Sequence, residues 1–134
     1  MRLFKRKAVE CQRARTDFTS GKCLSELEVV IRFFESQISS SLHDFHSKNI
    51  AHRDLKPTNI GYFSRDSSWK LMDLDTAADF GRTAPLSYTP AYAAPEIVKA
   101  AHRGDQSIEC DPAADMWALG IIAFEIISGM LFPS

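Results

Sequence analysis

The chain has 134 residues, a formal net charge of −1 and 45% hydrophobic residues, a composition typical of a folded segment with one core. This near-neutral balance gives no reason to expect nucleic acid or a membrane surface as a partner. The basic cluster in residues 1–15 indicates a solvated helix face, with a specific anionic partner as the alternative. Three widely spaced cysteines without a C-x-x-C pair favour a reducing intracellular compartment, the cytoplasm or alternatively the nucleus.

The first predicted elements are helical. Residues 1–15 have weak helical character and lead into a polar loop at 16–22. Ser25 and Glu28 form a capping box that opens a helix of about twenty residues, and Asn49 follows it as a left-handed cap. One apolar stripe at three- and four-residue spacing runs along this helix, made of Leu27, Val30, Ile31, Phe34, Ile38, Leu42 and Phe45.

Short strands are expected next, at residues 50–51, 59–63 and 69–74. A turn joins the last two strands, so they predict a small hairpin. Residues 76–92 contain one glycine and two prolines and show little periodicity, which predicts a long loop. Long irregular segments in compact domains are often functional.

Two helices are predicted in the last third of the chain. The first begins at Pro95 and runs to about residue 101, and a polar connection follows it. The second is an apolar helix over residues 113–128 that Gly129 ends. The apolar stretch 116–132 contains Glu125 and is shorter than the roughly 20 residues a bilayer span needs, so a buried helix is expected rather than a membrane segment.

The most informative stretch is the loop His52-Arg53-Asp54-Leu55-Lys56-Pro57-Thr58-Asn59. Asp54 can accept a proton from a substrate hydroxyl, Lys56 can place positive charge near a transferring phosphoryl group, and Asn59 supplies an oxygen ligand suited to magnesium. Taken singly, each residue has an ordinary alternative as a turn acid, a surface lysine or a turn former. Together they match the H-R-D-L-x-x-x-N catalytic loop, so the chain resembles the eukaryotic protein kinases.

This resemblance implies a mainly α fold: a fragment of the C-terminal kinase lobe in which a small β hairpin carries the catalytic loop and a metal-binding aspartate. It also implies transfer of the ATP γ-phosphate to a serine or threonine of a protein substrate. Asp54 and Lys56 are then the catalytic residues, and Asn59 and Asp73 bind Mg²⁺ and ATP. The alternatives are a pseudokinase-like module that only binds a protein partner and, less well supported, a small-molecule phosphotransferase.

The assignment of the second metal ligand rests on spacing within this resemblance. The family carries an Asp-Phe-Gly triplet, and that literal string occurs at 79–81. However, the triplet position follows a short strand, where this chain has Asp73-Leu74-Asp75. Asp73 precedes Glu96 by 23 residues, which leaves room for an activation loop, whereas Asp79 precedes it by only 17. The metal role is therefore assigned to Asp73, and Asp75 replaces a glycine and brings a second carboxylate near the metal.

Residues 88–96 resemble the family's G-T-x-x-Y-x-A-P-E segment, which shapes the peptide groove, with Tyr88 in place of the glycine. Thr89 and Lys56 together resemble the serine/threonine class, and Glu96 closes the segment. The resemblance also implies that Arg53 pairs with an activation loop phosphorylated by an upstream kinase. The candidate acceptors are Thr83, Ser87 and, third, Thr76; each is otherwise a plain loop residue.

The segment Asp115-Met116-Trp117-Ala118-Leu119-Gly120 resembles the D-x-W-x-x-G opening of the central kinase helix. By resemblance, Asp115 accepts backbone hydrogen bonds from the catalytic loop near His52 and Arg53. His52 is expected to be a packed scaffold residue rather than an acid or base. Core packing is expected of Trp117, Ile121, Ile122, Phe124, Ile126 and Ile127.

The resemblance covers residues 1–134 as a partial kinase domain, from the helix after the hinge through the central helix. The sequence has no G-x-G-x-x-G loop, no strand lysine of the V-A-I-K type and no helix glutamate to pair with it. Glu96 is expected to miss its arginine partner, and the central helix to expose apolar surface. The expectation is therefore a kinase fragment that is inactive alone, with protein substrates and no nucleic-acid or membrane partner.

Overall fold

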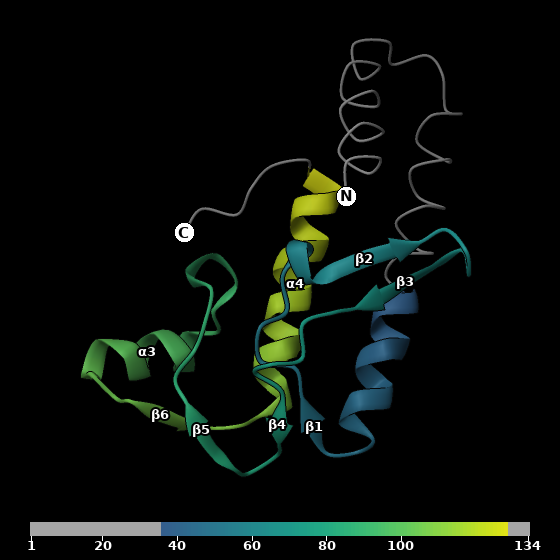
Figure 1. The fold of residues 1–134 in the computed structure, drawn as a ribbon. Coiled ribbons are helices and arrows are strands. Elements are labelled where there is room, and N and C mark those ends of the chain that lie inside the picture. Colours follow the sequence, from purple (N-terminus) through teal and green to yellow (C-terminus); the bar gives the residue numbers. More distant parts are fainter. Residues whose placement is uncertain (1–35, 129–134) are drawn as a thin grey trace.

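The computed structural model describes residues 36–128, which include helices and three small sheets (Figure 1). The described chain starts inside a helix that continues to residue 46, and Ile38 and Leu42 on this helix are buried. Asn49 follows with φ 58°, and its N–H donates to the His46 carbonyl at 2.9 Å, so the left-handed cap is confirmed. The predictions for residues 1–35, including the capping box at Ser25, and for Gly129 lie outside the described residues.

Three separate two-stranded antiparallel sheets lie among the described residues. β2 (Ile60–Phe63) and β3 (Ser68–Leu71) form the predicted hairpin, with Ile60 opposite Leu71. β3 ends before residue 74, because the chain turns at Asp73, which has φ 63°. The hairpin and the helix 36–46 lie on the same side of the molecule in Figure 1.

The segment 76–92, which was predicted to be a loop, contains two strands. β1 (Ile50–Ala51) pairs with β4 (Ala78–Asp79), and β5 (Thr83–Pro85) pairs with β6 (Ser107–Glu109). These strands have two or three residues each, and their partners are distant in the sequence. They are too short to show the alternation of apolar and polar residues from which a strand is predicted. The predicted mainly α fold is therefore corrected to a mixed α/β fold.

The remaining helices are close to the predicted ranges. α3 (Pro95–Arg103) begins with a proline and ends at Gly104, which has φ 80°. α4 (Pro112–Ser128) runs through the centre of Figure 1, and the short 3₁₀ turns η1 (Pro57–Asn59) and η2 (Pro90–Tyr92) precede β2 and α3. Within residues 36–128, no helix combines the length and the apolarity that crossing a bilayer would require.

The core joins the helix 36–46, the loop 52–59, β2 and α4. Its buried members are Ile38, Leu42, Leu55, Ile60, Ala118 and Ile122. Only one face of α4 is buried, and the side chains on that face are Asp115, Ala118, Ile121 and Ile122.

The prediction that six apolar residues of α4 pack in the core was wrong for three of them. Trp117 exposes 43% of its surface, Phe124 41% and Ile127 58%. The elements packed on α4 cover a single side, and at 3.6 residues per turn these positions point away from it. The sequence of α4 does not indicate which side of the helix is buried, because apolar residues occur all round it.

Candidate active site

The loop 52–59 is held at both ends by buried residues. Ala51 precedes it and Ile60 follows it, both buried, while Leu55 in the middle enters the core. The neighbours Asp54 and Lys56 are only partly buried. An apolar anchor inside a polar loop therefore fixes the loop on the core and leaves its charged groups accessible.

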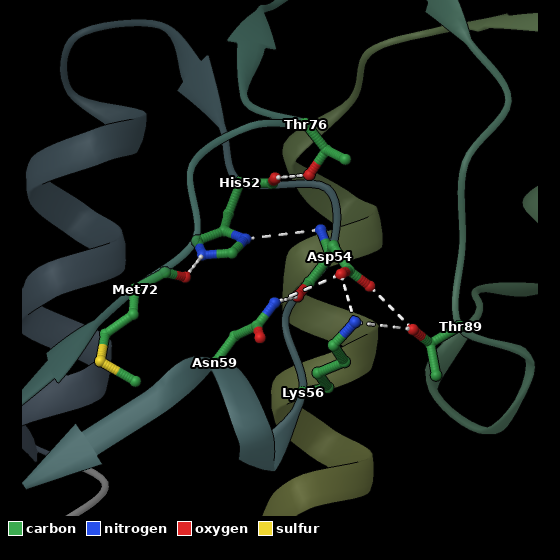
Figure 2. A network of polar contacts seen from close by, with 7 residues as sticks. All are labelled: His52, Asp54, Lys56, Asn59, Met72, Thr76 and Thr89. Carbon is green, nitrogen blue, oxygen red and sulfur yellow. Dashed lines mark hydrogen bonds and ion pairs between the residues drawn. The ribbon is translucent and has the colours of Figure 1, made fainter.

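Three side chains of this region converge on the carboxylate of Asp54 (Figure 2). Lys56 Nζ donates to Asp54 Oδ2 at 2.5 Å, and Asn59 Nδ2 approaches the same oxygen at 3.2 Å. Thr89 Oγ1 donates to the other oxygen, Oδ1, at 2.8 Å, and Lys56 Nζ also reaches Thr89 Oγ1 at 3.3 Å. The structure thus brings together Asp54, Lys56, Asn59 and Thr89, although Thr89 is 35 positions away from Asp54 in the sequence.

His52 is completely buried and connects the loop to the end of the hairpin. Its Nδ1 lies 3.4 Å from the backbone N–H of Asp54, and its Nε2 lies 3.1 Å from the Met72 carbonyl oxygen. Nδ1 thus faces a backbone donor and Nε2 a backbone acceptor, a pair of contacts that suits the tautomer with the proton on Nε2. Both ring nitrogens are engaged with backbone groups, which is the arrangement of a scaffold residue.

Asp115, at the start of α4, holds the backbone of the loop. Its side chain is 1% exposed, and its two oxygens accept the backbone N–H groups of His52 and Arg53, each at 2.8 Å. The contact expected for Asp115 is therefore present. His46, at the end of the first helix, adds a third hydrogen bond from Nε2 at 3.0 Å, which the sequence did not indicate. Arg53 has φ 70° at this point, so the fixed N–H groups sit in a sharply turned backbone.

The two predicted metal ligands lie at the ends of paired strands. Asn59 is buried just before β2, and its carbonyl oxygen accepts the N–H of Met72 at 2.9 Å. Asp73 follows Met72 directly, is exposed, and has a left-handed backbone. The amide oxygen of Asn59 lies on the side of its amide group that faces away from Asp54 (Figure 2). An amide oxygen and a carboxylate are the hard donors that Mg²⁺ prefers, so the residues present fit this ion.

Asp79, in the literal Asp-Phe-Gly string, occupies a different environment. It belongs to β4, lies opposite Ile50 of β1, and its side chain is 61% exposed with Arg82 at 3.6 Å. Phe80 packs its ring edgewise on His46, with centroids 5.6 Å apart. Residues 36–128 contain no cluster of three or more His, Cys, Asp or Glu side chains placed to hold a metal.

Four of the five residues predicted for the activation loop and groove lie around one pocket beside Asp54, namely Arg53, Ser87, Thr89 and Glu96. The guanidinium of Arg53 donates to the carbonyl oxygens of Thr76 at 3.0 Å and Pro85 at 2.6 Å. Thr83 and Ser87 are exposed, and Glu96 is exposed in the first turn of α3. This pocket is also lined by, among others, Tyr88, Tyr92, Ile97 and Cys110.

One polar pair in this region was not predicted. The hydroxyl of Tyr92 donates to Glu125 Oε2 on α4 at 3.0 Å. Burial and then the hydrogen bond and charge of Glu125 raise the pKa of Tyr92 to about 12. The signal in the sequence was Glu125 itself, because a carboxylate within an apolar helix needs a polar partner.

Comparisons with known proteins agree with this geometry. The protein kinase domain family matches residues 8–134. The human cAMP-dependent protein kinase catalytic subunit PRKX is 41% identical over 102 residues, which are 75% of this chain and 26% of that protein. The Drosophila melanogaster cAMP-dependent protein kinase catalytic subunit 3 is 39% identical over 111 residues, covering 82% of this chain and 17% of that protein.

Among solved structures, the Cydia pomonella granulovirus kinase PK-1 superposes with a TM-score of 0.65 and 26% identity, over 78% of this chain and 37% of that one. The chain therefore belongs to the protein kinase family, and its relatives are serine/threonine kinases. It spans about a quarter or less of the length of the human and fly relatives named above.

Proposed function

We propose that this chain provides the phosphoryl-transfer loop of a serine/threonine protein kinase. The observation that supports this most directly is the network around Asp54, in which a lysine, an amide and a threonine hydroxyl share one carboxylate. Phosphoryl transfer depends mainly on positioning and charge stabilisation, and this network positions a base and a cation on a rigid loop. The described residues would be part of the large, C-terminal lobe.

Asp54 would accept the proton of the substrate hydroxyl. A carboxylate offers about four acceptor positions, and Oδ1 receives one hydrogen bond, from Thr89, so it retains room for a substrate hydroxyl. Lys56 is ion-paired with Oδ2 and would place its charge beside the phosphoryl group as it transfers. Thr89 would fix the position of the peptide-binding segment, residues 88–96, relative to Asp54.

Asn59 and Asp73 would hold Mg²⁺ together with ATP, and the bound ion would neutralise charge on the phosphate oxygens. The chain's own contribution is to fix these two ligands. The hydrogen bond from Met72 N to Asn59 O fixes the ends of β2 and β3, and Asn59 Nδ2 is anchored on the Asp54 carbonyl at 3.0 Å. Asp75, two residues further on, would add negative charge near the ion.

The decisive experiment measures phosphorylation of a serine- or threonine-containing protein substrate by the protein as its cell produces it. Asp54→Asn should lower kcat by about 10² to 10⁴, because a positioned base contributes that range. The matched control is Asp66→Asn, since Asp66 makes an exposed ion pair with Lys70 in the hairpin turn. Unchanged kcat in the Asp54 variant would refute the assigned role.

The 134-residue chain alone should bind nucleotide weakly or not at all, because its sequence has no G-x-G-x-x-G phosphate loop. We therefore expect no increase in its melting temperature when Mg-ATP is added. A shift that grows with nucleotide concentration would contradict this expectation, because a ligand that binds the folded state stabilises it in proportion to its occupancy.

The second candidate function is a kinase-related module that binds a protein partner without catalysis. The observation that favours it is the exposed apolar side of α4, with Met116, Trp117 and Ile127 each more than 40% exposed. Asp75 and Tyr88, which depart from the kinase pattern, also favour it. A stable partner that copurifies with a protein inactive towards every substrate would support this alternative.

A further inference from the structure

The segment 81–86, which lies in the proposed activation loop, is paired along its length with the segment that precedes α4. β5 and β6 place Thr83 opposite Glu109, Ala84 opposite Ile108 and Pro85 opposite Ser107. The pairing extends at both ends: Gly81 N donates to the Cys110 carbonyl at 3.0 Å, and Leu86 N donates to the Gln106 carbonyl at 2.9 Å. This part of the loop is thus held by backbone hydrogen bonds.

Arg53 holds the same loop from the catalytic side. Its Nη1 donates to the Thr76 carbonyl and its Nη2 to the Pro85 carbonyl, so one guanidinium bridges two points of the loop nine positions apart. The backbone N–H of Arg53 is fixed on Asp115 at 2.8 Å. No ion pair between Arg53 and a carboxylate occurs in the described part of the chain. The Arg53 guanidinium therefore binds neutral carbonyl oxygens at the position where it could bind an anion.

Thr83 faces a negative charge across the β5–β6 pair. Directly opposite residues of an antiparallel pair lie on the same face of the sheet, and both Thr83 and Glu109 are exposed. A phosphate on Thr83 would bring a charge of about −2 opposite the Glu109 carboxylate. Like charges at directly opposite positions weaken strand pairing.

We propose that the unphosphorylated loop is already ordered by the two Arg53–carbonyl contacts and by β5–β6, and that negative charge at Thr83 loosens this loop. The relevance of this loosening to catalysis rests on the proposed kinase function. The ordering of the loop does not depend on that function. Thr83 would then be an inhibitory position rather than an activating one, and Arg53 a positioning residue that needs no phosphate.

The test is backbone amide hydrogen exchange on the unphosphorylated chain, followed at Leu86 N–H and Cys110 N–H, which donate to Gln106 and Arg82. Both amides should exchange more slowly than in an unstructured peptide. Thr83→Glu should speed both about two- to fivefold, the range expected for one opposed like-charge pair. Adding Glu109→Gln to Thr83→Glu should restore the original rates, and Ser87→Glu, outside the strand pair, should leave them unchanged.

Three outcomes would overturn the proposal. The first is that both amides of the unphosphorylated chain exchange as fast as in an unstructured peptide. The second is that they exchange more slowly in Thr83→Glu than in the original chain. The third is that Thr83→Glu speeds their exchange and Glu109→Gln does not reverse the change. Arg53→Gln should speed exchange at Leu86; if that variant fails to fold, the Thr83 and Glu109 variants still decide. No nucleotide or substrate enters these measurements, so a failure here is distinct from a failure of the kinase assay.

Discussion

At the scale of single residues, the geometry of the proposed catalytic loop, residues 52–59, depends on a group outside it. The carboxylate of Asp115 accepts three hydrogen bonds, from the backbone N–H groups of His52 and Arg53 and from the ring of His46. Both bonded N–H groups immediately precede Asp54. The position of the proposed base is therefore set by a buried acid on another element.

Asp115→Asn should destabilise the chain by about 2 to 4 kcal/mol, because an amide NH₂ would replace one acceptor and face a buried N–H donor. Chemical denaturation of the two proteins measures this difference. The matched control is Asp105→Asn at the exposed ion pair with Arg103, where a change below about 1 kcal/mol is expected. Equal effects of the two substitutions would show that Asp115 is not an anchor.

Tyr92 predicts an alkaline dependence of stability. Its pKa is about 12 in the folded chain and 10.0 in an ordinary tyrosine, so the folded state keeps a proton that the unfolded state loses. This contribution to stability is fully present below about pH 10 and is lost as the pH rises through about 12. Tyr92→Phe should flatten the decline between these values.

Ultraviolet absorbance provides the direct measurement, since ionised tyrosine absorbs near 295 nm. Ionisation of Tyr92 in the folded chain should therefore give a late step in this absorbance, near pH 12. The late step should disappear in Tyr92→Phe and persist in Tyr62→Phe, whose ring packs on Trp69 with centroids 5.2 Å apart. The absence of a Tyr92-dependent step near pH 12 would contradict the assigned pKa.

At the scale of elements, two glycines in or beside helices differ in their backbone requirements. Gly104 ends α3 with φ 80°, and its N–H donates to the carbonyls of Ala100 and Ala101. Gly120 lies within α4, where an added Cβ would meet no atom within 4 Å. The same substitution should therefore have opposite effects at the two sites.

Gly104→Ala should lower the free energy of unfolding by about 1 kcal/mol, because alanine is strained in the left-handed region. Gly120→Ala should raise it by about 0.5 to 1 kcal/mol, because alanine loses less backbone entropy in a helix. Denaturant titration of both variants measures the two changes. A gain at Gly104 or a loss at Gly120 would contradict the backbone geometry described here.

The sequence predicted the elements whose determinants are local. The β2–β3 hairpin, α3, α4 and the cap at Asn49 each depend on neighbouring residues, and they lie close to the expected ranges. β1–β4 and β5–β6 were missed because each pairs two- or three-residue strands from distant segments. The catalytic string could be recognised because its members are consecutive, whereas the contacts of His46 and of Glu125 join residues that are far apart.

At the scale of the whole molecule, apolar residues remain exposed where the described elements leave α4 and the hairpin uncovered. Tyr62 and Phe63 on the hairpin are exposed, as are Met116, Trp117 and Ile127 on α4. Surfaces of this kind indicate contact with further protein.

The mass of the product in the cell distinguishes the two proposed functions, since this sequence alone has a mass of 15.0 kDa. An antibody raised against the exposed turn around residues 64–69 allows the endogenous protein to be detected by immunoblotting. A band well above that mass would place the proposed catalytic loop in a larger protein. A band at 15.0 kDa would favour the partner-binding alternative.

The three hydrogen bonds of Asp115 also have a consequence for the order of folding. They connect it to His46, His52 and Arg53, which are 69, 63 and 62 positions away in the sequence. During synthesis the loop leaves the ribosome well before its anchor does, and contacts between distant positions form late because closing long loops is entropically costly. The catalytic loop should therefore acquire its final shape only when α4 docks, which makes assembly of the site one of the last steps of folding.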